Sequence, residues 1–244
     1  MNLLLIDAGN TRIKWGCSCD GEWLRQGWVP TAQPGALVAE FTDLPAIGRI
    51  LVSCVAGDAE RVAIAAALPA SAKPPRWLVA SEAQCGVRSS YADPASLGPD
   101  RWAALIGAWQ LTGAACVVVN AGTTMTVDAL GGDGVFLGGC ILPGARLMRE
   151  SLARDTARLA QRDGAFSYFP DNTGDAIFSG AVNALAGAVE RVAKYLGEIN
   201  GSPPPVLLSG GDAPLVEKRL NAQVTVVDNL VLEGLARIAA QSAG

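Results

Sequence analysis

Two continuous apolar runs, residues 3–7 and residues 116–120, dominate the pattern of hydrophobic and polar positions. Each run ends in a polar residue and is followed by a turn that contains glycine and threonine. Such runs are typical of strands that are buried on both faces of a sheet. A shift of 113 positions places the first run on the second, and Thr11 on Thr124, without a gap. The pattern therefore predicts two halves that begin with the same strand and turn.

The same shift places the dipeptide Asp20-Gly21 on Asp133-Gly134, and Asp-Gly between apolar runs is typical of a β-hairpin. We therefore expect each half to open with three strands. Strand and helix patterns alternate in the rest of the chain, as in α/β folds. The expected strands are 49–55, 76–80, 206–209 and 224–227, and the expected helices are 58–68, 99–112, 144–161, 173–199, 214–220 and 230–240. The predicted boundary near Gly113 gives an N-terminal lobe of residues 1–113 and a C-terminal lobe of residues 114–244.

Composition narrows the chemistry that these halves can carry. Of the 244 residues, 50% are apolar and 17% are charged, which suits a soluble protein with a large core. The formal net charge of −4 disfavours binding to nucleic acid or to an anionic membrane, because both need clustered Lys and Arg. The chain contains no histidine, which excludes Ser-His-Asp triads, Cys-His dyads and His-ligated metals. Carboxylates, Lys, Arg, hydroxyls, thiols and oxygen-bound metals remain.

The cysteines and the apolar segments indicate a cytoplasmic protein. None of the six cysteines forms a C-x-x-C pair, and their apolar neighbours are typical of buried, reduced thiols. The N-terminus lacks the basic region and the long apolar stretch of a signal peptide. Residues 102–127 carry no charge, but polar residues and Gly113 interrupt them. We expect a short helix, a break and a buried strand there rather than a membrane span.

The first turn, from Asp7 to Lys14, has the residues of a phosphate-binding loop. Asp7 ends a central strand, at the edge where open α/β sheets bind ligands, and a carboxylate there suits Mg²⁺. Gly9 allows the backbone to approach an anion closely, and Asn10 and Thr11 offer side-chain donors. An ordinary turn capped by an Asx side chain would show the same local sequence.

The second copy of the turn, Asn120-Ala-Gly-Thr-Thr124, favours the phosphate-binding interpretation. Two such turns that face one cleft can clamp a triphosphate from both sides. The other common nucleotide-binding patterns, G-x-x-x-x-G-K-[ST] and G-x-G-x-x-G, do not occur in the sequence. We therefore expect two related hairpins to hold one nucleotide.

The tetrapeptide Gly98-Pro99-Asp100-Arg101 begins the helix expected at 99–112. In one interpretation, Asp100 only complements the positive end of the helix dipole and Arg101 is solvated. In the other, Asp100 is the general base for a hydroxyl nucleophile and Arg101 binds a carboxylate or a phosphate. Because histidine is absent, a carboxylate is the remaining plausible base for phosphoryl transfer to an alcohol.

Three further features suit the edge of a substrate pocket. Tyr91 lies in the irregular stretch before the tetrapeptide. Thr173 begins a long helix, although Thr173 or Asn172 would also serve simply as its N-cap. The glycine-rich turn at 138–144 would border a substrate or allow two layers to pack closely.

Three motifs, in this order and spacing, resemble those of the type III pantothenate kinases: Asp7-Ala-Gly-Asn-Thr-x-x-Lys14, Gly98-Pro-Asp-Arg101 and Gly122-Thr-Thr-Met-Thr-Val-Asp128. The resemblance covers the whole chain. It implies the α/β fold of the actin- and hexokinase-like ATPase superfamily, with two duplicated ribonuclease-H-like lobes and a nucleotide cleft between them. It also implies ATP-dependent phosphorylation of pantothenate, the first step of coenzyme A biosynthesis, in a homodimer with substrate pockets near the subunit interface.

The resemblance implies roles for particular residues, in agreement with the residue-level interpretation. Asp100 is the expected proton acceptor, and Asp7 is the expected ligand of Mg²⁺. The residues expected to contact ATP are Asp7, Ala8, Gly9, Asn10, Thr11, Arg12, Ile13, Lys14 and Thr123. Those expected to contact pantothenate are Gly98, Pro99, Asp100, Arg101 and Thr173, and the position of Tyr91 adds it to this set.

One position departs from the family pattern. The family usually has an aspartate three residues before the second-loop threonine, where it binds a monovalent cation such as K⁺ or NH₄⁺, and this chain has Asn120. A neutral amide lacks the charge that helps to hold such a cation. The sequence therefore predicts a weak or absent dependence on K⁺.

Two other classes of protein share some of these features. A sugar kinase or a polyphosphate phosphatase of the same superfamily would have both phosphate loops. A non-catalytic transcriptional accessory protein is the second class, because some family relatives are described in that way. The set of Asp7, Lys14, Asp100 and Arg101 favours an enzyme, since a structural role does not need it.

Overall fold

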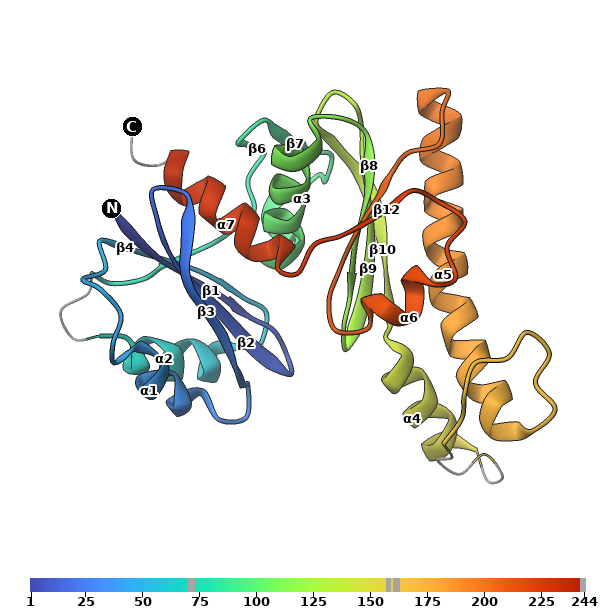
Figure 1. Cartoon of the computed structure of the whole chain (residues 1–244). Coiled ribbons are helices and arrows are strands. Elements are labelled where there is room, and N and C mark those ends of the chain that lie inside the picture. The colour runs from blue at the N-terminus through green and yellow to red at the C-terminus, as the bar shows by residue number, and fades with distance from the viewer. Residues whose placement is uncertain (70–72, 157–158, 160–162, 242–244) are drawn as a thin grey trace. The chain divides into compact units, whose positions relative to one another are not determined.

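The computed structural model describes residues 1–69, 73–156, 159 and 163–241. The chain forms two compact units, the first made of Met1–Leu111 and Asn229–Gly244 and the second of Thr112–Asp228. Each unit contains a β-sheet with helices packed against it (Figure 1). Among the described residues, no helix has the length and apolar character needed to cross a membrane.

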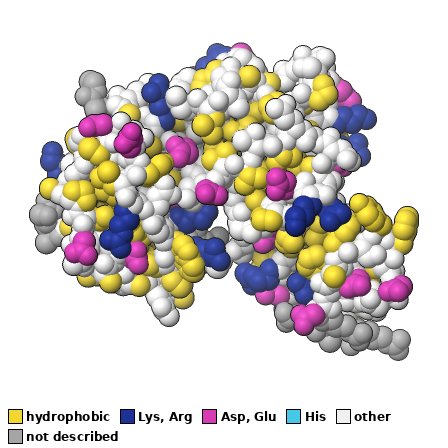
Figure 2. All heavy atoms as spheres, in the orientation of Figure 1, with side chains coloured by type: hydrophobic (Ala, Val, Ile, Leu, Met, Phe, Trp, Pro, Cys, Tyr) yellow, Lys and Arg dark blue, Asp and Glu magenta, His cyan; other side chains and the backbone are white. Residues whose placement is uncertain are grey.

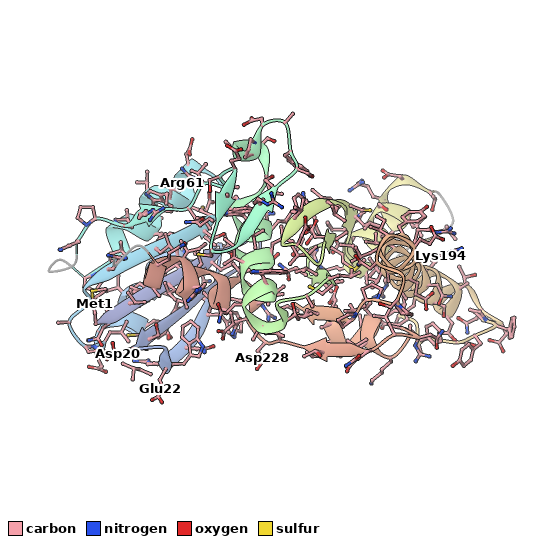
Figure 3. All side chains as sticks on the ribbon, turned by 90° about the horizontal axis from the view of Figure 1, so that it is seen from above. Met1, Asp20, Glu22, Arg61, Lys194 and Asp228 are labelled. Atoms are coloured by element: carbon pink, nitrogen blue, oxygen red, sulfur yellow. The ribbon has the colours of Figure 1, made fainter. Side chains whose placement is uncertain are left out.

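The sheet of the first unit has five strands in the order β3-β2-β1-β4-β5. Strands β1, β2 and β3 pair antiparallel, whereas β4 runs parallel to β1 and β5 parallel to β4. Asp20 and Gly21 form the hairpin between β2 and β3, and both have positive φ angles, 49° and 92°. Figure 3 shows Met1 beside this hairpin, where the terminal ammonium group donates to Asp20 Oδ1 at 2.9 Å. The strands are β1 Asn2–Ala8, β2 Arg12–Cys19, β3 Glu22–Pro30, β4 Arg49–Cys54 and β5 Arg76–Trp77.

Helices cover both faces of this sheet. The short helix α1 (Leu37–Phe41) and helix α2 (Asp58–Ala67) share a core with the alternate strand residues that point to their side, such as Leu4 and Ile6. Helix α7 (Leu230–Gln241) packs along β1, β4 and β2, on the opposite side in Figure 1. The unit is completed by helix α3 (Pro99–Thr112, whose last residue falls in the second unit), by the hairpin of β6 (Ala83–Gln84) and β7 (Val87–Ser89), and by the 3₁₀ turns Pro34–Ala36 and Pro94–Ser96.

The second unit repeats this plan. Its strands lie in the order β12-β11-β8-β9-β10, with β8, β9 and β10 antiparallel and β11 and β12 parallel to β8. The long helix α5 packs on β8 and β9 and buries Leu185 and Val189 in the core. The elements are β8 Cys116–Ala121, β9 Thr124–Leu130, β10 Val135–Pro143, α4 Ala145–Asp155, α5 Thr173–Asn200, β11 Val206–Ser209, α6 Ala213–Glu217 and β12 Val224–Val226.

The two units therefore confirm the predicted duplication at the level of topology. In both, the third strand pairs with the second, the second with the first, the first with the fourth and the fourth with the fifth. The shift of 113 positions places β3 on β10 from end to end, and both strands finish at a proline, Pro30 and Pro143. One chain pattern has thus folded twice into the same arrangement of strands.

Most of the elements expected from the sequence are confirmed, and α3 and β11 have the expected bounds. The strand expected at 76–80 ends at Trp77. The helix expected at 144–161 ends at Asp155, and residues 157–158 and 160–161 of that prediction lie outside the described residues. Helix α1 and the β6–β7 hairpin were not expected, because segments of two to five residues are too short to show a period.

The C-terminal helix lies in the first unit, whereas the predicted lobe of residues 114–244 places it in the second. Helices α3 and α7 approach closely through glycines, since a Cβ at Gly107 would lie 2.6 Å from the carbonyl oxygen of Leu230 and one at Gly234 would overlap the carbonyl of Ala103. Trp23 Nε1 also donates to Glu233 Oε1 at 2.9 Å, which ties α7 to β3. These contacts join segments more than 100 residues apart, so local sequence patterns do not reveal them.

The replacement Gly234→Ala tests this helix contact. The added methyl group would meet backbone atoms of α3, which cannot rotate away, so we expect the free energy of unfolding to fall by about 2–3 kcal/mol. Gly187→Ala is the matched control, because Gly187 lies in α5 and no atom of the described residues, apart from its immediate surroundings in the helix, lies within 4 Å of the added Cβ. This replacement should stabilise the protein by about 0.5–1 kcal/mol. Urea unfolding measures both. Equal effects of the two replacements would contradict the close packing of α3 on α7.

Candidate active site

Three polar side chains form a row across the first sheet, close to the carboxyl end of β1. In the strand register Asp7 of β1 pairs with Lys14 of β2 on one side and with Ser53 of β4 on the other. Residues paired in this way project to the same face of a sheet, and adjacent strands are about 4.8 Å apart. The predicted residues Asp7 and Lys14 are therefore brought together, and the structure adds Ser53, which the sequence did not indicate.

The turn that follows β1 exposes its polar residues while its backbone is fixed. Gly9 N donates to the carbonyl oxygen of Arg12 at 3.1 Å, and Thr31 Oγ1 donates to the carbonyl oxygen of Gly9 at 2.7 Å. Asn10, Thr11 and Arg12 are exposed, whereas the flanking Ala8 and Ile13 are buried in the core. A turn with this pattern can present backbone and side-chain donors to an anion.

Arg12 does not extend freely from this turn. Its guanidinium carbon lies 4.5 Å from the centroid of the Trp28 ring, at the end of β3 that borders the turn. Such a cation–π contact holds a positive charge beside the turn. Together with Lys14, this makes the surroundings of the loop favourable for a phosphate group.

A second carboxyl group acts on Asp7. The pKa of Asp7 is raised from 3.8 to about 7, mainly by removal of the carboxyl group from water and then by the negative charge of Asp100, whereas Lys14 and Ser53 oppose the change. Asp7 keeps some solvent exposure on one side. We attribute the raised pKa to the protein atoms that enclose the rest of the carboxyl group. Two neighbouring carboxyl groups in poor contact with water bind a proton or a cation readily.

Asp100 lies in the first turn of α3, after Pro99. Burial raises its pKa, and a hydrogen bond from the backbone N–H of Arg101 to Asp100 Oδ1, at 2.8 Å, counteracts part of the change. A Cβ at Gly98 would lie 2.6 Å from Asp100 Oδ1, so glycine leaves the space that this carboxylate occupies. A carboxylate that has a raised pKa and is still partly exposed is suited to accept a proton near neutral pH.

Arg101 is buried, with 6% of its surface exposed, and its Nη1 donates to the hydroxyl oxygen of Tyr91 at 3.2 Å. The alternative interpretation of a solvated arginine is therefore wrong. Tyr91, Gly98, Pro99, Asp100 and Arg101 lie in the same unit as the first loop. A buried guanidinium group with a polar neighbour is a suitable partner for a carboxylate.

The second loop is held by a different set of contacts. Gly122 N donates to the carbonyl oxygen of Thr124 at 3.1 Å, and Gly144 N donates to that of Thr123 at 2.9 Å. Asp212 N donates to the carbonyl oxygen of Ala121 at 2.9 Å, so the segment Ser209-Gly210-Gly211-Asp212 lies beside the loop. The sequence analysis did not identify this segment. The signal was present as two glycines directly after the strand β11.

Thr173 lies in the second unit, at the N-terminus of α5. Asn172 is the N-cap, because its side chain accepts from the N–H of Asp175 at 3.0 Å, and the capping interpretation is thereby confirmed for Asn172. Thr173 lines a cavity of about 800 Å³ together with residues of α4 and α5 such as Met148 and Ile177. The clamp of both loops on one nucleotide and a shared pantothenate pocket for Thr173 and Arg101 stay predictions.

The residues of the first unit fit a hard divalent cation. No group of three or more Cys, Asp or Glu side chains within the described residues is arranged to hold a metal by itself. Asp7 and Asp100 supply oxygen ligands of the type that Mg²⁺ takes, and Mg²⁺ commonly binds one or two carboxylates together with phosphates and water. The buried hydroxyl of Ser53, which pairs with Asp7 in the strand register, adds a donor that can orient the carboxylate.

Comparisons with known proteins agree on one family. A family model described as type III pantothenate kinase matches residues 3–195. The type III pantothenate kinase of Nitrosospira multiformis is 45% identical over 240 residues, covering 98% of this chain and 92% of that protein. The corresponding protein of Aromatoleum aromaticum is 48% identical over 241 residues, covering 99% of both.

A solved structure shows the same fold at low sequence identity. A ROK family glucokinase from Streptomyces griseus, in complex with glucose and AMPPNP, superimposes with a TM-score of 0.56 at 12% identity, covering 99% of this chain and 100% of that chain. The predicted α/β fold with two lobes of repeated topology is thereby confirmed.

The raised pKa of Asp7 predicts that Asp7→Asn stabilises the protein at high pH. A carboxyl group whose pKa rises on folding favours the folded state most below pH 4, and this stabilisation is lost as the pH rises through about 7. An amide does not ionise, so Asp7→Asn should be more stable than the parent by about 2 kcal/mol at pH 8 and nearly equal to it at pH 4. Urea unfolding at both values measures this difference.

Asp20→Asn provides a control of opposite sign. The hydrogen bond from the N-terminal ammonium group lowers the pKa of Asp20, so this carboxylate stabilises the fold above its unfolded pKa. Its replacement should therefore reduce stability at neutral pH, and the difference from the parent should become smaller as the pH falls below 3.8 towards the lowered pKa of Asp20. An Asp7→Asn variant that is less stable than the parent at pH 8 would contradict the raised pKa of Asp7.

Proposed function

Because the chain belongs to the type III pantothenate kinase family, we propose that it transfers the γ-phosphoryl group of ATP to pantothenate. The product is 4′-phosphopantothenate, and the reaction is the first step of coenzyme A biosynthesis. The observation that carries this proposal is the proximity of Asp100 to Asp7 at the end of the strand that leads into the first phosphate loop. Phosphoryl transfer to an alcohol needs a base for the hydroxyl proton, here Asp100, beside a group that holds the cation of the phosphate chain, here Asp7.

Asp100 acts as the general base. The 4′-hydroxyl oxygen of pantothenate attacks the γ-phosphorus, and its proton passes to the Asp100 carboxylate. The bond from the γ-phosphorus to the bridging oxygen breaks, and ADP leaves. Because the pKa of Asp100 is raised, its carboxylate accepts a proton more readily near neutral pH, as a general base must. An acid that only stabilises the helix dipole would not need to be buried.

The other residues bind and orient the substrates. The first loop, Asp7 to Lys14, and Thr123 bind the phosphate tail of ATP through donors and positive charge. Arg101, with Tyr91, binds the carboxylate of pantothenate. When bound at Asp7, Mg²⁺ would neutralise charge on the phosphate oxygens. Thr173 is assigned to the pantothenate pocket through the family resemblance.

Assembly and location are further parts of the proposal. We assign the protein to the cytoplasm, where its six free cysteines would stay reduced. We also propose a homodimer, which agrees with the large aromatic side chains Tyr168 and Phe169 that are exposed before α5. On the face in Figure 2, Lys and Arg side chains are interspersed with Asp and Glu, a distribution that offers no support for a nucleic acid as partner.

Transfer of labelled γ-phosphate to pantothenate by the purified protein tests the function. The reaction contains ATP, MgCl₂ and pantothenate, and the labelled product is separated from ATP by chromatography. Parallel reactions with glucose, or with water alone, test a sugar kinase and a phosphatase. Label transfer to pantothenate supports the proposal, and transfer only to glucose or to water contradicts it.

Replacement of Asp100 by Asn is expected to lower kcat by about 10²–10⁴-fold, because the amide cannot accept the proton. ATP binding, measured calorimetrically with a non-hydrolysable analogue, should stay close to that of the parent. Asp58→Asn is the matched control, since Asp58 is also an acid in the first turn of a helix but lies exposed on α2. Similar kcat values for the two variants would remove Asp100 from its role as base.

Asn120 leads to a prediction about monovalent cations. The parent should keep most of its activity when K⁺ and NH₄⁺ are replaced by a bulky organic cation, because an amide provides no charge to hold them. Asn120→Asp restores the carboxylate and should create a K⁺ activation on the order of tenfold, equivalent to about 1.4 kcal/mol. A steep loss of parent activity without K⁺ would refute the prediction.

A further inference from the structure

Ser53 has an unusual environment for a serine. It is completely buried in β4, with none of its surface exposed, and within the part of the chain that the structure describes its Oγ has no hydrogen-bond partner at full geometry. Buried hydroxyl groups are normally satisfied, and one that is not destabilises the fold. An alanine would fill nearly the same space without the cost of burying a hydroxyl that makes no hydrogen bond. Packing therefore does not explain the hydroxyl of Ser53.

The nearest polar group in the strand register is Asp7. Ser53 pairs with Asp7 across the parallel strands β4 and β1, and its hydroxyl acts on the carboxyl group in the direction that favours the ionised form. Among the described residues, no hydrogen bond between Ser53 Oγ and the Asp7 carboxyl group meets full geometry. The hydroxyl is therefore placed to donate after a small movement of either side chain.

The second unit offers an internal comparison. Ser209 of β11 pairs with Asn120 of β8, in the same topological position as Ser53 beside Asp7. Its Oγ donates to the carbonyl oxygen of Asp228 at 3.3 Å. In the second unit, where the paired residue is the amide Asn120, the serine hydroxyl thus donates to the backbone. In the first unit, where the paired residue is the carboxyl group of Asp7, the Ser53 hydroxyl stays available to that group.

We propose that Ser53 is a positioning residue for Asp7. Its hydroxyl donates to one oxygen of the ionised Asp7 carboxylate and so leaves the other oxygen directed to the divalent cation of the nucleotide. This inference rests on the proposed function, because it assumes that Asp7 is a ligand of that cation. Partners that orient a metal ligand in this way affect metal affinity or activity by about 10–100-fold when they are removed.

The test compares Ser53→Ala with Ser53→Thr and with a matched control, Ser18→Ala. Ser18 is a buried serine of the same sheet, with 2% of its surface exposed, but its partner in β1 is Leu3. Three quantities are measured for each protein: the melting temperature, the Kd of Mn²⁺ for the complex with a non-hydrolysable ATP analogue by electron paramagnetic resonance, and kcat with pantothenate.

We expect Ser53→Ala to weaken Mn²⁺ binding and to lower kcat by about 10–100-fold, with a melting temperature equal to or above that of the parent. Ser53→Thr keeps the hydroxyl and should recover most of both quantities, and Ser18→Ala should change neither. Parent-like Mn²⁺ binding in Ser53→Ala would overturn the proposal. So would a loss of activity that accompanies a lower melting temperature and normal Mn²⁺ binding, because that pattern indicates a packing role.

The two proposals fail in different ways. If the parent binds Mn²⁺ with the nucleotide but does not phosphorylate pantothenate, the proposed function is wrong, and the effect of Ser53→Ala on Mn²⁺ binding still tests the positioning role. If the parent phosphorylates pantothenate and Ser53→Ala matches it in both readouts, only the inference about Ser53 is wrong. A Ser53→Thr protein that melts like the parent but recovers neither quantity would also contradict it.

Discussion

The confinement of two carboxyl groups in poor contact with water is the constraint on which the candidate site depends. Burial raises the pKa of both Asp7 and Asp100, and the negative charge of Asp100 adds to the effect on Asp7. Lys14 and the backbone N–H of Arg101 offset only part of these changes. A fold that only needed stability would place other residues there. The protein instead keeps two poorly solvated negative charges, which a substrate-bound cation and a transferred proton can neutralise.

The strand register places the other polar groups of the site around Asp7. Ser53, Asp7 and Lys14 come from three strands, yet they form one row because each pair is in register. The hydrophobic residues that alternate with them, such as Leu4 and Ile6, fix that register by filling the core on the other face. Core packing on one face of the sheet therefore determines the spacing of the polar groups on the other face.

Much of this arrangement was visible in the sequence. The apolar runs, the Asp-Gly turns and the 113-residue shift predicted the repeated strands, since these signals are local or repeat at a constant offset. Asp7 and Asp100 were found because each lies beside a turn or a helix start. Ser53 was missed because a single serine inside an apolar strand carries no signal until the neighbouring strand is known. The position of α7 was missed for the same reason, since it depends on packing between distant segments.

The return of α7 to the first unit has a consequence for biosynthesis. A ribosome makes this helix only after the whole of the second unit, although β1, β2 and β4 need it as cover. Until then one face of the N-terminal sheet lacks its apolar cover and is open to chaperones or to aggregation. The Thr112–Asp228 segment is contiguous, so every part of the second unit is available for folding before the last helix of the first unit has been made.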